Sequence, residues 1–205
     1  QLPRDAAAKS VISLTFAAVA THNHFVLDKA GRVFKQSAPV IKFSKETPDE
    51  LPLGLLGILN SSSACFWLKQ NSHKKAGALH GGGSSGQSWS HIFDFTGTTL
   101  LDFPLPVDLP AQRGRTLDRL GRQLASNEPA ALSAEGIITA TLLGQARTAY
   151  GHARGRMVAE QEELDWEVYR LYGLVNEDYT YSGDDLPELK LGERGFEIVL
   201  ARKVA

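Results

Sequence analysis

The sequence lacks several features that would assign it to a membrane or to an oxidising compartment. Its single cysteine, Cys65, excludes an internal disulfide and fits a reducing cytoplasm. The longest apolar runs, such as residues 11–20, fall well short of the roughly 20 residues that span a bilayer, so we expect no membrane segment. The chain begins at Gln1 without methionine or a basic leader. We therefore expect a piece of a longer cytoplasmic protein.

Motifs for several enzymatic chemistries are also missing. There is no Asn-Pro-Pro-Tyr or related tetrapeptide, with which amino methyltransferases hold a flipped base. There is no Gly-x-x-x-x-Gly-Lys phosphate loop, no paired-cysteine zinc spacing and no convincing dinucleotide fingerprint after a strand. We therefore expect this chain to carry no enzymatic site and no cofactor of its own.

Acidic residues are missing from one long stretch and concentrated in another. From Leu51 through Phe93 there is no Asp or Glu, whereas Lys69, Lys74 and Lys75 lie inside with three histidines. The segment Glu160–Glu188 has the opposite character, with ten acidic residues and a single arginine. The net charge of −1 hides this asymmetry, and local charge sets the field that a polyanion meets. The first stretch is thus suited to nucleic acid, although a solvated charged face stays an alternative.

Hydrophobic periodicity predicts short strands in the first half of the chain. The strand candidates are residues 11–20, 25–27, 33–34, 40–43, 93–95 and 100–105. Gly31 is expected to take the positive φ of a tight hairpin between the second and third candidates. From Leu51 to Leu59 leucines return at helical spacing, and the run 60–63 can end that helix and cap a second one. Prolines 104, 106 and 110 mark a boundary.

The second half has helical periodicity. Leu117, Leu120 and Leu124 form one apolar stripe, and residues 137–173 are expected to form one or two longer helices. The apolar residues of this longer segment that share one face are Met157, Leu164, Val168 and Leu171. The sequence therefore predicts an α+β protein, with a mixed α/β domain at 1–110 and a helical region with an acidic tail at 111–205.

A glycine- and serine-rich loop at 80–88 imitates a hydrolase. Gly82-Gly-Ser84-Ser-Gly86 matches the nucleophile-elbow pattern, and the preceding His80-Gly-Gly-Gly83 imitates an oxyanion loop. The elbow requires a buried strand before its serine, but residues 72–77 are mostly polar and the two motifs overlap. We therefore expect no hydrolytic site, and we expect the loop to become ordered only on binding.

Two other patterns are compatible with catalysis or metal binding but favour neither. His22-Asn23-His24 could place two imidazoles on one face of a strand, yet no third ligand is indicated nearby. Asn23 and its neighbours could instead hydrogen-bond either the backbone or DNA bases, and the sequence does not choose between these. Cys65 lies among apolar neighbours, so we expect an inert thiol. We predict no catalytic and no metal-binding residue.

The segment from Lys69 to Lys75 carries side chains suited to DNA. Lysines give salt-sensitive phosphate contacts, and Asn and Gln can contact adenine edges through two hydrogen bonds. Lysines near a helix end also interact with the helix dipole, so the pattern alone is weakly specific. The predicted DNA-contacting residues are Lys69, Gln70, Asn71, His73, Lys74 and Lys75, with His22, Asn23 and His24 as secondary candidates.

Several segments, taken in order, resemble the target-recognition region of the PglX adenine-specific DNA methyltransferases of BREX phage-defence systems. These segments are residues 21–27, 37–42, 55–62, 66–70, 95–106 and 161–174. The Leu-Leu-x-x-Leu-Asn-Ser-Ser and Leu-Asp…Leu-Tyr-Gly-Leu elements also resemble methylase and restriction-modification proteins with a TaqI-like C-terminal specificity domain. The likeness extends from about Thr15 to the end of the chain.

The resemblance implies a recognition domain and a helical region that follow a methyltransferase domain absent from this chain. That domain would bind S-adenosylmethionine and methylate N6 of a flipped adenine, whereas this chain would bind double-stranded DNA and select the site. The implied partners are double-stranded DNA, the missing domain and other defence-system proteins. The competing interpretation is a protein-interaction module, in which Glu160–Glu188 docks other components of the system.

Overall fold

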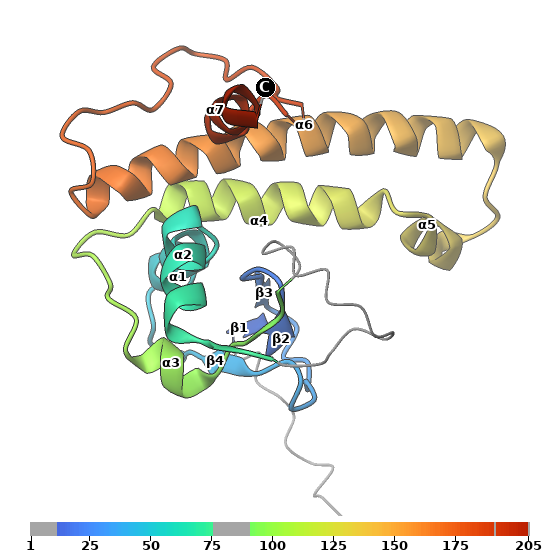
Figure 1. Ribbon diagram of the computed structural model, residues 1–205. Coiled ribbons are helices and arrows are strands. Elements are labelled where there is room, and N and C mark those ends of the chain that lie inside the picture. Colours follow the sequence, from blue (N-terminus) through green and yellow to red (C-terminus); the bar gives the residue numbers. More distant parts are fainter. Residues whose placement is uncertain (1–11, 76–90, 191, 205) are drawn as a thin grey trace, which may run out of the picture. The chain divides into compact units, whose positions relative to one another are not determined.

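The computed structural model describes residues 12–75, 91–190 and 192–204 (Figure 1). Helices and small antiparallel sheets are both present, which confirms the α+β class. The chain divides into two compact units, Gln1–Ala111 and Gln112–Ala205. The assignment of these units as a recognition domain and a helical region stays a prediction.

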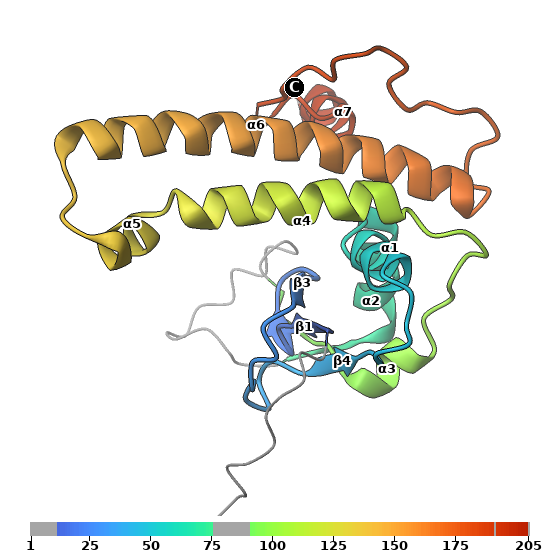
Figure 2. The same ribbon diagram turned by 180° about the vertical axis from the view of Figure 1, so that it is seen from behind.

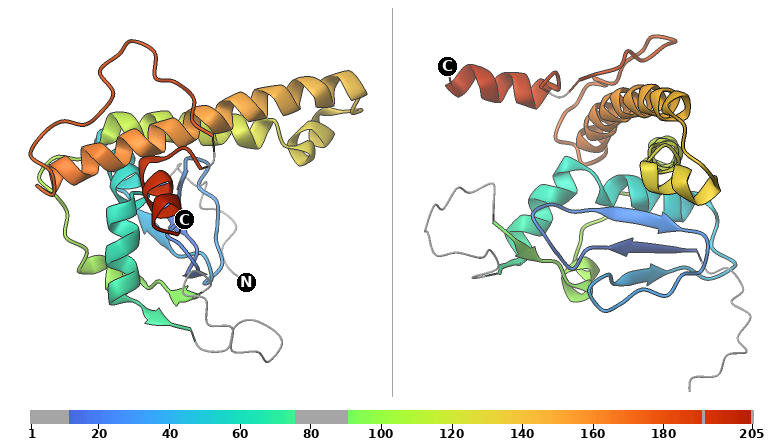
Figure 3. Two further views of the ribbon diagram at one scale, coloured as in Figure 1. Left: turned by 45° about the horizontal axis from the view of Figure 1, so that its top comes forward. Right: turned by 90° about the vertical axis from the view of Figure 1, so that its right-hand side faces the viewer.

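A three-stranded antiparallel sheet forms part of the core of the first unit. The central strand β1 (Ser13–Phe16) pairs with β3 (Phe25–Asp28) on one side and with β4 (Val40–Lys42) on the other (Figure 3). Leu14 lies opposite Leu27, and Phe16 lies opposite Phe25 with 5.0 Å between the ring centroids. Because alternate residues of a strand share a face, these four buried side chains form one apolar surface. Helix α1 (Glu50–Leu59) packs against it.

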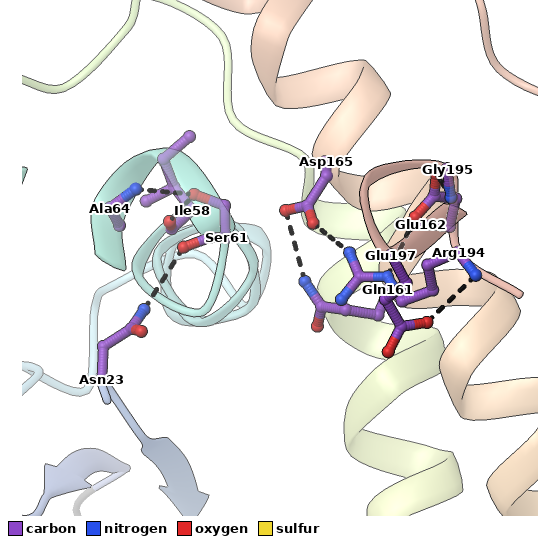
Figure 4. A network of polar contacts seen from close by, with 10 residues as sticks. All are labelled: Asn23, Ile58, Ser61, Ala64, Gln161, Glu162, Asp165, Arg194, Gly195 and Glu197. Carbon is purple, nitrogen blue, oxygen red and sulfur yellow. Dashed lines mark hydrogen bonds and ion pairs between the residues drawn. The ribbon is translucent and has the colours of Figure 1, made fainter. Parts of the chain in front are cut away.

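The corner between α1 and α2 (Ser62–Asn71) is held by a buried polar network. The fully buried Ser61 caps α2, because its hydroxyl accepts a hydrogen bond from the amide of Ala64 at 3.1 Å and donates to the Ile58 carbonyl at 2.7 Å (Figure 4). Asn60 hydrogen-bonds both backbone groups of Phe25, at 2.9 and 3.0 Å. The N-cap that Ser61 forms stabilises α2 by about 1 kcal/mol. The prediction that residues 60–63 end one helix and cap the next is confirmed.

A second small sheet joins three strands that are distant in sequence. Strand β6 (Phe93–Asp94) is central, with β2 (Val19–Ala20) on one side and β5 (His73–Lys74) on the other. The amide of Phe95 extends this pairing by donating to the Ala18 carbonyl at 2.7 Å. The sheet therefore connects the end of α2 to the segment that follows β1.

Three of the strand predictions were wrong. Residues 11–20 do not form one strand, because β1 and β2 belong to different sheets. Residues 33–34 are not a strand: although Gly31 has the expected positive φ of 65°, the Asp28 carboxylate accepts a hydrogen bond from the Arg32 amide and the chain leaves the sheet. Residues 100–105 are not a strand, because α3 (Gly97–Leu101) takes up the first two of them. This helix is capped by Thr96, whose hydroxyl accepts a hydrogen bond from the amide of Thr99.

The second unit is built on two long helices that lie side by side. Helices α4 (Ala111–Ser126), α5 (Pro129–Glu135), α6 (Ala140–Leu171) and α7 (Gly195–Val204) follow in chain order, and α6 returns alongside α4 (Figures 1 and 2). Helix α6 is one continuous helix of 32 residues. Leu164 and Val168, two members of its predicted stripe, are fully buried, whereas Met157 and Leu171 are half-buried.

Within the described ranges, no single helix is long and apolar enough to cross a membrane. Helices α1 and α2 meet such a criterion only as a pair, and the chain bends by 68° between them. Most of α1 is buried in the first unit, and buried core helices satisfy the same test of length and composition.

Candidate nucleic-acid interface

The small sheet brings separate parts of the acid-free stretch together. In its register Lys74 lies opposite Phe93, which in turn lies opposite Ala20. Directly opposed residues of an antiparallel pair have side chains on the same face, so Lys74 shares a face with the Phe93 ring. The loop that carries His22 and His24 continues directly from Ala20 at the end of β2.

Lys69 approaches the same aromatic residue from α2. Its Nζ lies 5.7 Å from the centroid of the Phe93 ring, which stacks with the ring of Phe95 at 6.1 Å. Partial desolvation, and after it the charge of Lys69, lower the pKa of the exposed His22 side chain. Lys75 follows β5, where its amide donates to the Ile92 carbonyl at 2.8 Å. We call Lys69, Lys74 and Lys75 the cationic cluster.

Two of the amide side chains predicted to contact DNA, those of Asn23 and Asn71, donate hydrogen bonds to the backbone instead. The Asn23 side chain donates to the carbonyls of Leu59 and Ser61 at 2.6 and 3.3 Å, and the Asn71 side chain donates to Trp67 at 2.8 Å. A bidentate adenine contact needs the donor and the acceptor of an amide together, so either residue would have to release a backbone carbonyl. Of the two alternatives left open for Asn23, the structure favours the backbone. His24, Gln70 and His73 are exposed.

Two of the segments that resemble the target-recognition region, residues 21–27 and 55–62, contact each other in the fold. Asn23, from the segment 21–27, binds the corner formed by the segment 55–62, and Asn60 of that corner binds Phe25 in return. The corner fixes where α2 begins, and α2 ends at Asn71 beside the strand that carries His73 and Lys74. The cationic cluster is therefore positioned by buried polar contacts that sequence reasoning treated as separate motifs.

The other candidate chemistries gain no support. Cys65 is a half-buried free thiol, less buried than expected. Among the residues that the structure describes, no three His, Cys, Asp or Glu side chains are grouped to hold a metal ion. The elbow-like pattern with Ser84, and the whole loop 80–88, lie outside the described residues.

Much of the acidic segment is an internal ion-pair network and not a solvated face. Glu160 and Glu163 are buried within the second unit, where Arg113 of α4 reaches them at 2.7 and 3.6 Å and reaches Glu167 at 3.5 Å. Burial raises the pKa of Glu167, while the Arg113 charge opposes that shift. Arg156 lies 3.6 Å from Glu160 on the same helix.

A second arginine joins α6 to the start of α7. Arg194 pairs with Glu162 at 2.9 Å and with the buried Asp165, and the Gly195 amide donates to Glu162 at 3.1 Å (Figure 4). The guanidinium also lies 4.8 Å from the centroid of the Phe196 ring. The buried Glu160, Glu163 and Asp165 therefore have arginine partners inside the second unit, and a docking role for Glu160–Glu188 stays a prediction. Sequence reasoning missed their partners, although Glu160 precedes Leu164 by one helical turn and so shares its buried stripe.

An apolar groove lies between α6 and α7. It has a volume of about 480 Å³, and its apolar lining includes Trp166, Tyr169, Phe196 and Val199. Phe196 and Val199 are more than half exposed. Its charged lining consists of Arg194 with its partners Glu162 and Asp165, together with Lys203.

The chain is similar in sequence to part of a known methyltransferase. Residues 157–205, which contain the end of α6, the acidic tail and α7, match a family described as "Domain of unknown function (DUF7008)". No solved structure matches the chain. The chain is 50% identical over 212 residues to "Adenine-specific methyltransferase PglX" of Streptomyces coelicolor, and the match covers 100% of this chain and 17% of that protein. The chain is therefore a homologue of one portion of an adenine-specific methyltransferase.

Proposed function

We propose that this chain is the DNA-recognition part of a larger adenine-specific DNA methyltransferase. The observation that carries this proposal is the cationic cluster, in which Lys69 and Lys74 lie beside Phe93 in a stretch without acidic residues. The homologous methyltransferase supplies the class of reaction. Lysines positioned in this way bind phosphates and release counterions, which is the main source of sequence-independent affinity for DNA.

In the whole protein, the chemistry would belong to a separate methyltransferase domain. That domain would bind S-adenosylmethionine and transfer its methyl group to N6 of an adenine flipped from the duplex. This chain would contribute no catalytic residue; it would hold the duplex and select the site. A role in BREX-type phage defence, within the cytoplasm, follows from the resemblance to PglX methyltransferases.

Fluorescence-anisotropy binding to a mixed-sequence duplex over a salt series tests the proposal. With three or four phosphate contacts, the logarithm of the binding constant is expected to fall with a slope of about −3 against the logarithm of salt concentration. Absence of binding at low salt, or a binding constant that does not change with salt concentration, would contradict the proposal for this chain.

The affinity for DNA is expected to increase as the pH falls from neutrality toward the lowered pKa of His22. In the free chain, desolvation and, after it, the charge of Lys69 lower the pKa of His22, which favours its neutral form. A phosphate near Lys69 would raise that pKa, so binding would take up a proton and would strengthen in acid. Binding curves at several pH values measure this effect. His22→Gln should reduce the pH dependence, whereas His152→Gln, at an exposed position of the second unit, should preserve it. Equal profiles for wild type and His22→Gln would contradict the prediction.

A protein-interaction module is the second candidate function. The apolar groove between α6 and α7 favours it, because Phe196 and Val199 are exposed there beside Trp166. A partner would be the methyltransferase domain itself or another component of the defence system. The salt series distinguishes the two candidates, since a chain that acts only by docking protein would not bind the duplex at any salt concentration.

A further inference from the structure

The outward face of α2 is centred on an aromatic side chain. Ala64 and Leu68 are fully buried and form the inner stripe of this helix. At roughly 100° per residue, Phe66 lies on the opposite side, and it is 68% exposed. Gln70 follows one turn later on the same side and is exposed as well. Positions i and i+4 of a helix are neighbours, so Phe66 and Gln70 form one surface.

The core of the unit does not account for Phe66. The adjacent Trp67 packs edge-on against Phe103 with 5.2 Å between the ring centroids, whereas Phe66 points away from that core. A single exposed apolar residue is ordinary and indicates no function by itself. The residues near Phe66 in the sequence are what indicate a binding surface. Lys69 lies one turn away on the same helix, Lys74 and Lys75 follow its end, and no acidic residue occurs from Leu51 through Phe93.

We propose that the outward face of α2 enters the major groove of duplex DNA and that Phe66 and Gln70 make the base contacts that select the target. This inference rests on the proposed function. The major groove admits an α-helix, glutamine pairs with the N6 and N7 edge of adenine, and an apolar side chain contacts the thymine methyl group. The two residues together would recognise A·T pairs, or an adenine and a thymine in adjacent pairs.

Charge favours DNA over a protein as the occupant of this face. Lys69 lies on the same helix and Lys74 and Lys75 follow its C-terminal end, where they would meet the phosphates that border the groove. Phosphate contacts fix position and supply affinity, whereas base contacts supply selectivity. The cationic cluster and the outward face of α2 therefore have separate roles, and these can be measured separately.

Selection from a library of duplexes with a randomised core tests the division. The 205-residue chain is used as wild type, Phe66→Ala, Gln70→Ala and the double variant, with Leu101→Ala as control because Leu101 is 86% exposed in the same unit. The wild type and the control should enrich the same A·T-containing sequence. The double variant should lose at least about 5-fold of the discrimination at the contacted pairs while it keeps the salt slope for mixed-sequence DNA. Phe66→Leu, which preserves an apolar contact, should retain part of the preference at the thymine.

Each contrary outcome has a distinct meaning. Unchanged enrichment in the double variant overturns the assignment of base contacts to Phe66 and Gln70 and leaves the proposed DNA binding intact. Uniform loss of affinity with a smaller salt slope, at an unchanged melting temperature, would make them backbone contacts and would also overturn it. Failure of the wild type to bind any duplex would overturn both proposals, and binding of protein at Phe66 would then be the remaining interpretation.

Discussion

Replacing Arg113 with alanine is expected to lower the free energy of unfolding of the second unit by about 3 kcal/mol, the lower end of the range for a broken buried ion pair. Arg113 is 24% exposed, and it lies 2.7 Å from Glu160 and 3.6 Å from Glu163, both buried. Its removal leaves these carboxylates with less compensation in a poorly solvated region. The exposed part of the guanidinium justifies the lower figure.

Urea unfolding of the chain, followed by far-UV circular dichroism, measures this effect. Arg119→Ala is the matched control, because Arg119 is exposed on the same helix. Adding Glu163→Gln to the Arg113→Ala variant should recover part of the loss, since it removes a buried charge that has lost its arginine partner, while the Gln side-chain oxygen can still accept the hydrogen bond from the Tyr181 amide. Equal stability of Arg113→Ala and Arg119→Ala would show that the network does not stabilise the unit.

Simultaneous replacement of Lys69, Lys74 and Lys75 with alanine is expected to weaken binding to mixed-sequence duplex DNA by roughly 10- to 1,000-fold near 0.1 M salt. Each lysine that contacts a phosphate contributes about one unit to the salt slope, so the slope should become shallower by up to about 3. The loss should be the same for every sequence, because phosphate contacts carry no direct sequence information.

The matched control replaces three other lysines of the same unit, Lys35, Lys42 and Lys45, all of which are exposed. Both triple variants remove three positive charges and change the formal net charge from −1 to −4. A similar loss of affinity in both would mean that overall charge, and not the cationic cluster, governs binding. Anisotropy titrations at several salt concentrations separate the two results.

Helices of the first unit were predictable because their signals are local. The leucines of α1 recur within ten residues, and the capping residue Ser61 is adjacent to the helix that it caps. The strands were less predictable because their partners are remote. Residues 11–20 look like one strand, but β2 is separated from β1 by its pairing with β6, more than seventy positions along the chain.

The same distinction applies to the candidate site. The charge pattern of Lys69 to Lys75 is visible in the sequence, whereas the hydrogen bonds that occupy Asn23 and Asn71 depend on how the chain folds. Arg113 lies 47 residues from Glu160, so no local pattern reveals that the acidic helix is neutralised from within. The sequence alone does not distinguish Phe66 from the neighbouring Trp67. In the structure Phe66 is exposed on the outward face of α2, whereas Trp67 packs on Phe103.

Lysine acetylation with and without duplex DNA, quantified at each residue by mass spectrometry, tests most directly whether the cationic cluster contacts DNA. Each lysine is compared with itself, so differences in exposure between residues do not affect the result. Slower acetylation of Lys69, Lys74 and Lys75 in the presence of the duplex, with unchanged rates at Lys35, Lys45 and Lys190, is the expected outcome. Unchanged rates at the first three lysines under conditions where the duplex is bound would contradict the proposed interface.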